Sequence, residues 1–340
     1  MLAPAKINLN LTVGPRRADG YHPVCSLMEP VSVFDTISVR PGRGGVKLAG
    51  AGIPAAENTV VKAALALEKI TGAGLDVEIG LSKEIPVAAG LGGGSSDAAA
   101  ALKLFISTFS LNVSEADLAA LAFSVGADVP FFLRQGAQLA EGAGEILKAA
   151  GRMPEHWIVL LSPGLGLSTA RVYHQFDAMG GGNKEDFIRR SQELNDAVAA
   201  LESFESLCRV LQNDLEPAAT SICDDIVKNK QLLKEAGSPA VLMSGSGPSV
   251  FGLFPNEGQA RAAAERLRRS FDRVWVARPL TQAAQAFSLC KHKQNGRHML
   301  LACADTRNFP SSGSSPGDLG VFPDFKILSK GYAFIYKFCR

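Results

Sequence analysis

The chain has 340 residues, of which 46% are apolar and 20% are charged, so it is long enough to bury a substantial core. Its 35 basic and 33 acidic residues give a formal net charge of +2, which excludes a global field that would attract nucleic acid or an anionic membrane. The six cysteines show no CxxC or Cys/His metal spacing, which argues against a structural zinc site and favours reduced thiols.

The N-terminus lacks the succession of charged region, apolar region and cleavage site that marks a signal peptide. No apolar run approaches the ~20 residues that are needed to cross a bilayer. We therefore expect a cytoplasmic protein that has neither a nucleic-acid nor a membrane partner and that binds any polyanion locally.

The first predicted element is a strand over residues 4–13, in which apolar and polar residues alternate. This alternation places Ile7 and Leu9 on one face and Lys6 and Asn8 on the other. A turn-rich segment follows at residues 16–22.

The rest of the chain mixes helical and strand patterns without strict alternation, which favours an α+β fold over a doubly wound parallel sheet. Helices are expected at 58–70, from Ser95 onward, and at 114–125, 185–201 and 257–270, and strands at 31–39, 75–81, 157–161, 240–243, 249–254 and 273–277. Residues 285–340 show no sustained period and are rich in Pro, Gly and Ser, so we expect a disordered or loosely packed tail.

A glycine-rich segment at residues 86–97 has the strongest local signal for chemistry. Its glycines can bring several backbone N–H groups close to one anion, and Ser95 and Ser96 add hydroxyl groups and polar caps at the positive end of the following helix. The spacing matches neither a Walker A loop nor a Rossmann fingerprint. We predict a phosphate-binding loop; the alternative is a flexible Gly/Ser linker.

Three other features carry weaker signals. The segment at residues 244–254 is a second glycine-rich loop, although a plain turn between two strands would look similar. Asp128 lies between a helix end and an apolar run, where it could accept a proton from a hydroxyl group or could simply cap a turn. Lys6 shares a strand face with asparagines, but a lysine on a strand is usually solvated.

Taken in order, these segments resemble the GHMP kinase superfamily. The matching pieces are Pro4-Ala-Lys-Ile-Asn-Leu, the phosphate loop Gly90-Leu-Gly-Gly-Gly-Ser-Ser-Asp and Gly245-Ser-Gly-Pro-Ser. Arg17-Ala-Asp-Gly-Tyr-His narrows the resemblance to the diphosphocytidyl-methylerythritol kinases, which Gly126-Ala-Asp-Val-Pro-Phe also matches. The similarity covers about residues 2–280.

The resemblance implies a two-lobed fold with an ATP-binding lobe of ribosomal-S5-like type at 1–150, a ferredoxin-like lobe at 151–284 and a tail outside the family at 285–340. It further implies transfer of the ATP γ-phosphoryl group, with Mg²⁺, to the 2-hydroxyl of a cytidyl diphospho-sugar alcohol in isoprenoid precursor synthesis. The protein would be a monomer or a weak homodimer, and no protein metal site is expected.

The resemblance also assigns roles to residues. Asp128 matches the general base and Lys6 matches the cation beside it, in agreement with the need to deprotonate a hydroxyl nucleophile. ATP-binding positions fall on Asn58, Lys83, Pro86, Ala88, Ala89, Gly90, Leu91, Gly92, Gly93, Gly94, Ser95 and Ser96. Acceptor-binding positions fall on Asn8, Tyr21, His22, Tyr173, Gly245 and Ser246.

Within the acceptor set, Tyr21 and His22 would stack on and hydrogen-bond the cytosine, with Tyr173 on its opposite face. The alternatives are that Tyr21 and His22 belong to an ordinary turn and that Tyr173 is a plain core aromatic.

Two other functions stay open on the sequence. Another GHMP kinase, acting on homoserine, a sugar or mevalonate, is disfavoured by the tetrapeptide Asp-Gly-Tyr-His at residues 19–22. A nucleotide-binding protein without catalysis is disfavoured by the presence of both Lys6 and Asp128.

Overall fold

The computed structural model describes residues 1–50, 54–271 and 273–281, and beyond them only the backbone of four short strands. The chain divides into a compact unit at Met1–Leu280 and a second unit at Thr281–Arg340. The lobe boundary that was predicted near residue 150 lies inside the first unit and stays a prediction.

The N-terminal lobe is a seven-stranded sheet. Its central pair is β1 (Leu2–Val13) and β2 (Val24–Pro41), which run antiparallel from Leu2 opposite Thr36 to Val13 opposite Val24. The order is β3-β4-β2-β1-β8, with β5 joining β2 to β6. The remaining strands are β3 (Val46–Ala49), β4 (Val77–Ser82), β5 (Gln138–Glu141), β6 (Ile146–Ala149) and β8 (Gln212–Asn213).

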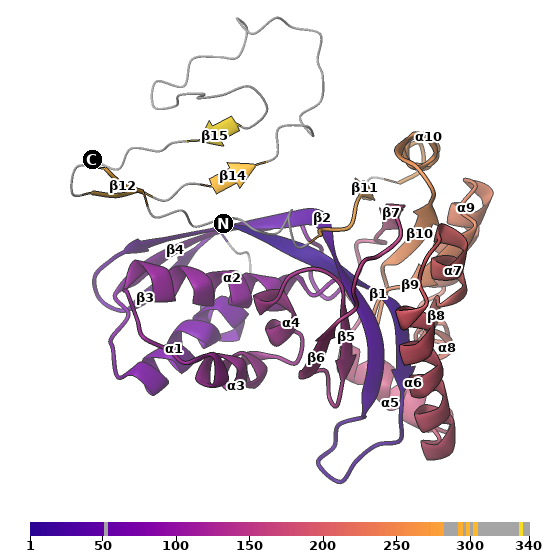
Figure 1. Cartoon of the computed structure of the whole chain (residues 1–340), viewed down its shortest axis with the longest axis horizontal. Helices are drawn as coiled ribbons and strands as arrows, with labels where there is room; N and C mark the ends of the chain where they lie inside the picture. The colour runs from indigo at the N-terminus through magenta and orange to yellow at the C-terminus, as the bar shows by residue number, and fades with distance from the viewer. Residues whose placement is uncertain are drawn as a thin grey trace, which may run out of the picture. The chain divides into compact units, whose positions relative to one another are not determined.

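Helices cover one side of this sheet (Figure 1). They are α1 (Thr59–Thr71), α2 (Gly93–Thr108), α3 (Glu115–Val125) and α4 (Val129–Leu133), with the 3₁₀ turn η1 (Ala55–Glu57) before α1. Helix α1 begins at Asn58, whose side chain accepts the Val60 N–H, and ends at Gly72 in the left-handed conformation. Alternation in β4 buries Val77 and Ile79 against these helices.

The C-terminal lobe is a four-stranded antiparallel sheet in the order β11-β7-β10-β9. Its strands are β7 (Trp157–Leu161), β9 (Ala240–Met243), β10 (Val250–Phe254) and β11 (Val274–Ala277). Helices lie between β7 and β9 and between β10 and β11, which gives the connectivity of a ferredoxin-like sheet. The predicted α+β fold with two lobes, the second of them ferredoxin-like, is therefore confirmed.

The helices of this lobe are α5 (Thr169–Ala178), α6 (Lys184–Ala199), α7 (Phe204–Arg209), α8 (Glu216–Thr220), α9 (Asp225–Glu235) and α10 (Glu257–Leu267). Alternation in β7 turns Val159 toward a core that includes α9 and α10, while Ile158 belongs to a second core. That second core also contains Ile7 and Leu9 of β1. The two sheets therefore share one apolar layer, and β1 is buried on both faces.

A buried ion pair also joins the lobes. His156, which directly precedes β7, donates from Nε2 to Glu29 of β2 over 2.9 Å and from Nδ1 to the Pro154 carbonyl oxygen over 2.8 Å. Burial lowers the pKa of His156, but the charge and hydrogen bond of Glu29 outweigh burial and raise it overall. Two buried charges are tolerated here because each satisfies the other.

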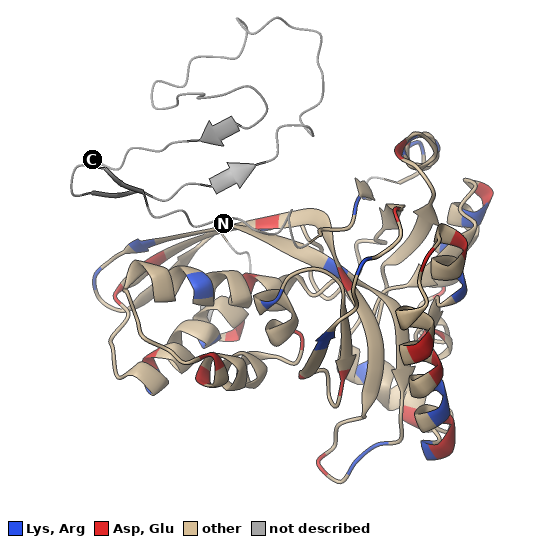
Figure 2. Cartoon of the chain, viewed as in Figure 1, with Lys and Arg blue, Asp and Glu red and all other residues tan. Residues whose placement is uncertain are grey.

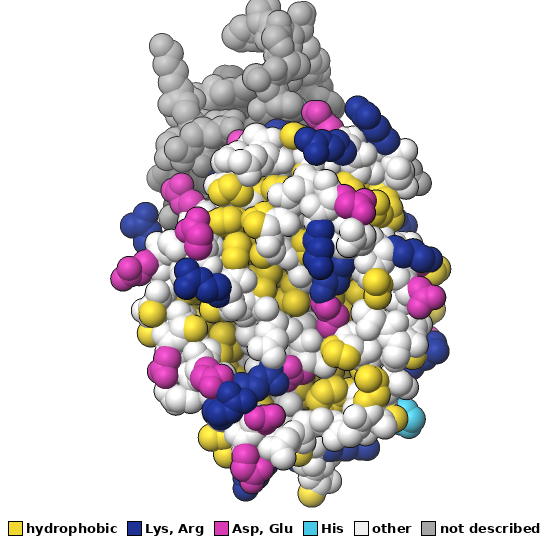
Figure 3. Space-filling view, turned by 90° about the vertical axis from the view of Figure 1, so that its right-hand side faces the viewer, with side chains coloured by type: hydrophobic (Ala, Val, Ile, Leu, Met, Phe, Trp, Pro, Cys, Tyr) yellow, Lys and Arg dark blue, Asp and Glu magenta, His cyan; other side chains and the backbone are white. Residues whose placement is uncertain are grey.

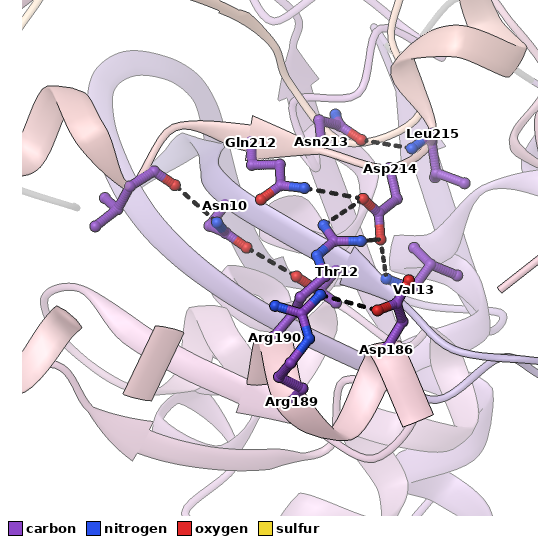
Figure 4. A network of polar contacts seen from close by, with 11 residues as sticks. Asn10, Thr12, Val13, Asp186, Arg189, Arg190, Gln212, Asn213, Asp214 and Leu215 are labelled. Atoms are coloured by element: carbon purple, nitrogen blue, oxygen red, sulfur yellow. Dashed lines mark hydrogen bonds and ion pairs between the residues drawn. The ribbon is translucent and has the colours of Figure 1, made fainter. Parts of the chain in front are cut away.

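Polar contacts attach helix α6 and strand β8 to the outer edge of β1 (Figure 4). The guanidinium of Arg190 donates two hydrogen bonds to Asp214, at 2.6 and 3.0 Å. The same carboxylate accepts the backbone N–H of Val13 over 2.9 Å. Asn10 donates to the Val210 carbonyl oxygen over 2.7 Å. Asp214 therefore holds three segments of the chain together.

Both signs of charge are spread over the first unit, as expected from the near-zero net charge (Figure 2). The face that carries α6 shows basic and acidic side chains interspersed with apolar ones (Figure 3). In the part of the chain that the structure describes, no helix has the length and apolar character needed to cross a membrane.

Beyond Leu280, the second unit contains two antiparallel strand pairs, β12 (His292–Gln294) with β13 (Arg297–Met299) and β14 (Ala302–Ala304) with β15 (Ala333–Ile335). Apart from the backbone of these strands, residues 285–340 lie outside the described residues. The predicted disorder or loose packing of this tail stays a prediction.

The Arg190–Asp214 pair allows a test of how the lobe edge is stabilised. Asp214→Asn should lower the free energy of unfolding by about 1–3 kcal/mol, because it weakens charge-assisted hydrogen bonds that are largely shielded from water. Urea denaturation measures the change. The control Asp186→Asn removes an exposed partner of Arg189 on the same helix and should change stability by less than about 0.5 kcal/mol. Equal effects of the two substitutions would contradict this role of Asp214.

Candidate active site

A pocket of ≈ 960 Å³ lies between the two lobes of the first unit. Its walls come from β1, the hairpin between β1 and β2, the glycine-rich loop, the start of α4, helix α5 and the loop between β9 and β10. This volume is at the upper end of what small-molecule sites usually enclose, which suits two ligands bound together.

The glycine-rich loop runs directly into helix α2. The helix begins at Gly93, with Gly92 as its N-cap at a φ of 69° and no side-chain cap. The prediction that the helix starts at Ser95, capped by serine hydroxyls, is therefore wrong by two residues. Glycines can form the first turn without side chains, so its unpaired N–H groups are left open to an anion.

Most predicted ATP-binding residues line this pocket. The lining residues from that set are Asn58, Lys83, Pro86, Ala88, Ala89, Gly90, Gly92, Gly93, Gly94 and Ser95. Leu91 and Ser96 are not among the lining residues and are buried. Leu91 packs in the core shared by the lobes, and its carbonyl oxygen accepts the backbone N–H of Lys6 over 2.9 Å.

The phosphate loop packs on the second glycine-rich loop, backbone against backbone. Gly90 has a φ of 76°, and a Cβ atom there would collide with the carbonyl oxygen of Ser244. The Ser244 hydroxyl donates to the Gly90 carbonyl oxygen over 2.9 Å and accepts the backbone N–H of Asn8 over 3.3 Å. One buried serine thus links both loops to β1.

Lys6 and Asp128 meet at this junction. Lys6 Nζ lies 3.6 Å from Asp128 Oδ2 and donates to the Asn8 side-chain oxygen. The Lys6 side chain is 5% exposed, whereas that of Asp128 is 36% exposed and reaches the pocket. A Cβ atom on Gly245 would lie 3.1 Å from Lys6 Nζ, so the ammonium group also adjoins the second loop.

Asp128 is the N-cap residue of α4 but makes no side-chain cap hydrogen bond, which leaves its carboxylate free for the pocket. The other end of α4 is held by Lys103 of α2, whose ammonium donates to the Phe132 carbonyl oxygen over 2.9 Å. Burial lowers the pKa of Lys103 to about 8. The C-terminal end of the short helix is thereby fixed to α2.

Lys83 is held by two buried carboxylates that sequence reasoning did not identify. It forms ion pairs with Asp35 and, over 2.7 Å, with Asp97. Asp35 also accepts the backbone N–H groups of Glu84 and Ile85 at 2.7 and 2.9 Å. Asp97 Oδ1 has no hydrogen-bond partner among the described residues. The ammonium group of Lys83 is therefore already neutralised by protein.

This arrangement shifts the pKa of Asp97. Burial, opposed by the charge of Lys83 and assisted by that of Asp35, raises it to about 7. The sequence offered a signal for Asp97, its place directly after the serines of the loop, but that pattern suggested a helix cap.

At the other end of the pocket lie the aromatic residues that were assigned to the acceptor. Tyr21 is 56% exposed, whereas His22 is buried with its ring 5.1 Å from that of Tyr173. Burial, and next the charge of Asp128, raise the pKa of Tyr173. Asn8, Gly245 and Ser246 also line the pocket, and Ser246 bonds to Thr169 of α5 over 2.8 Å.

Two family models match the chain. The model for the GHMP kinases N terminal domain matches residues 58–136, and that for the GHMP kinases C terminal matches residues 195–273.

Two relatives of this chain carry the same name. A 4-diphosphocytidyl-2-C-methyl-D-erythritol kinase from Desulfitobacterium hafniense is 39% identical over 81% of this chain and 94% of its own length. The protein of the same name from Pelotomaculum thermopropionicum is 41% identical over 82% of this chain and 96% of its own.

Solved structures agree with these relatives. A crystal structure of 4-(cytidine 5'-diphospho)-2C-methyl-D-erythritol kinase has a TM-score of 0.67 at 36% identity and covers 82% of this chain and 98% of its own. A homoserine kinase from Cytophaga hutchinsonii, at 19% identity and a TM-score of 0.61 over 83% of this chain and 95% of its own, shares the fold.

The contact between the two loops predicts the effect of a small side chain. Gly90→Ala should destabilise the protein by about 1–3 kcal/mol and weaken ATP binding, because the added methyl group collides with backbone and the positive φ is strained. Calorimetry gives both quantities. Gly74→Ala is the control, since a Cβ atom there has open space, and it should be nearly neutral. Unchanged stability and affinity in Gly90→Ala would refute the close packing.

The raised pKa of Asp97 predicts a pH-dependent contribution to stability. The folded state holds this proton up to about pH 7 and the unfolded state only to about pH 3.8, so the contribution is full below pH 3.8 and is lost as pH rises to about 7. Between pH 4 and pH 8, the free energy of unfolding of Asp97→Asn should therefore rise by roughly 1–4 kcal/mol relative to that of wild type. Urea denaturation of both proteins at each pH measures this. A difference between them that does not change with pH would contradict it.

Proposed function

This chain belongs to the 4-diphosphocytidyl-2-C-methyl-D-erythritol kinases of the GHMP kinase family, and from this premise we propose that it transfers the γ-phosphoryl group of ATP to the 2-hydroxyl group of 4-diphosphocytidyl-2-C-methyl-D-erythritol. It is an ATP-dependent phosphotransferase of isoprenoid precursor synthesis. The observation that carries the mechanism is the Lys6–Asp128 pair, 3.6 Å apart beside the phosphate loop.

In the proposed mechanism, Asp128 accepts the proton of the attacking hydroxyl group. Its carboxylate makes no cap hydrogen bond and reaches the pocket, which supports this role. Lys6, which is buried, keeps the carboxylate in place and stabilises the negative charge that develops on the hydroxyl oxygen. Asn8 orients the lysine through its side-chain oxygen.

The backbone N–H groups of Gly92 to Ser95 are proposed to hold the phosphates of ATP. A side chain on Gly92 would meet Lys6 and Phe132 at 3.0 Å, so only a glycine leaves this approach open. Catalysis of phosphoryl transfer rests largely on such positioning and charge stabilisation. Lys83, bound by Asp35 and Asp97, would support the loop as well as adjoin the nucleotide.

We propose that Mg²⁺ enters with the phosphates of ATP. Within residues 1–50, 54–271 and 273–281, no group of three or more His, Cys, Asp or Glu side chains is placed to hold an ion. Mg²⁺ commonly keeps several waters and needs only one or two carboxylates besides substrate phosphates. Bound there, the ion would neutralise phosphate charge, and Ser95 and Asp128 are among the oxygen-bearing side chains that line the pocket.

The acceptor is proposed to place its cytosine between the hairpin that carries Tyr21 and helix α5, which carries Tyr173. Localisation in the cytoplasm, and a monomer or weak homodimer, remain our predictions. The free thiols of Cys25, Cys208 and Cys223 are compatible with a reducing compartment.

Asp128→Asn tests the mechanism. The amide cannot accept the proton, so kcat should fall by roughly 10²–10⁴-fold while ATP affinity stays nearly unchanged. ADP release with Mg-ATP and the proposed acceptor measures turnover, and homoserine and mevalonate serve as alternative acceptors. Asp196→Asn, an exposed residue of α6, is the control and should keep wild-type turnover. Near-wild-type kcat in Asp128→Asn would remove Asp128 from the mechanism.

A further inference from the structure

His22 is held by a carboxylate that the mechanism above does not use. Asp177 Oδ1 lies 3.2 Å from His22 Nε2, and the other ring nitrogen lies 2.9 Å from the Gly14 carbonyl oxygen. Both Asp177 and His22 line the pocket. The motif at residues 17–22 identified His22, but nothing in the sequence pattern identified Asp177.

These contacts determine what the imidazole can do. The Nδ1 atom faces a carbonyl oxygen and the Nε2 atom faces a carboxylate, so both ring nitrogens of His22 are occupied by acceptor oxygens of the protein. Neither nitrogen then faces a bound base. The side chain is 4% exposed, and the Phe176 ring meets it edge-on at 5.8 Å, so the ring cannot turn without losing these contacts.

The fixed ring supports Tyr173. The two rings lie 5.1 Å apart at an angle of 34°. Tyr173 and Asp177 are four residues apart on α5, so they project from the same face of the helix toward the same histidine. His22 is thus positioned between the carboxylate that fixes it and the tyrosine that it supports.

We infer that Asp177 is a positioning residue that acts through His22 to hold the Tyr173 ring where the nucleobase of the acceptor binds. The inference rests on the proposed function for the identity of the base. It changes the role expected for the His22 ring from a hydrogen-bonding partner of cytosine to a support for the aromatic platform. Arg16, 3.8 Å from the other carboxylate oxygen, is 62% exposed and contributes little to this arrangement.

The test compares Asp177→Asn with wild type in the full chain. Calorimetry with cytidine 5′-diphosphate should show about 5- to 30-fold weaker binding, because the carboxylate that contacts His22 Nε2 is lost. The KM for the acceptor should rise by a similar factor, while kcat and the KM for ATP stay within about twofold. The ¹⁵N resonance of His22 Nε2 should also shift. Asp186→Asn, which makes the same chemical change at an exposed site, should leave all five quantities unchanged.

A conservative variant separates positioning from folding. Asp177→Glu keeps the carboxylate and should bind cytidine 5′-diphosphate more tightly than Asp177→Asn. Unchanged affinity in Asp177→Asn, or an equal loss of kcat, ATP affinity and thermal midpoint, would overturn the inference. If the wild-type protein binds cytidine 5′-diphosphate but phosphorylates no acceptor, the proposed function is contradicted. The role of Asp177 is still tested, because it is judged from the affinities of wild type and the Asp177 variants for cytidine 5′-diphosphate.

Discussion

The geometry of the site depends on the packing of the phosphate loop, backbone against backbone, on the loop between β9 and β10. Gly90 lies so close to Ser244 that a methyl group does not fit, and the Ser244 hydroxyl links this contact to β1. Each loop comes from a different lobe, so their contact sets the distance between two walls of the pocket. Positioning of two substrates is the main contribution that a protein makes to phosphoryl transfer.

The charges around this contact are buried in balanced groups. Lys6 lies beside Asp128, Lys83 lies between Asp35 and Asp97, and the lobes share the His156–Glu29 pair. An isolated charge at these places would be costly, and each partner offsets that cost while fixing the geometry. The Lys83 group holds one cation and two carboxyl groups, so Asp97 retains its proton to near-neutral pH. Lys6 has the more exposed partner, Asp128, whose side chain is 36% exposed and lines the pocket.

Local patterns predicted most of the regular elements. The strand at 157–161 has the predicted bounds, and the helices predicted at 58–70 and 114–125 differ from them by at most one residue, because alternation, capping residues and glycine stops act within a few residues. The turn from the glycine-rich loop into helix α2 was predicted for the same reason. Helix α5 was not predicted, although Val172, Tyr173 and Phe176 have helical spacing and pack in one core.

Long-range contacts were beyond the sequence. Asp35 is 62 residues from Asp97, and Ser244 is 236 residues from Asn8, so no local spacing could reveal these groups. Leu91 and Ser96 were assigned to ATP by their place in a motif, but a loop that turns into a helix must point some residues into the core. The family resemblance supplied Lys6, Asp128 and Tyr173 together, whereas each alone had an ordinary structural explanation. The proposed transfer to one hydroxyl group of the acceptor can be followed by ³¹P NMR of the product. We expect a new phosphomonoester on the 2-hydroxyl group with the diphosphate of the acceptor intact, whereas a phosphomonoester elsewhere, or ADP release without one, would rule out this transfer.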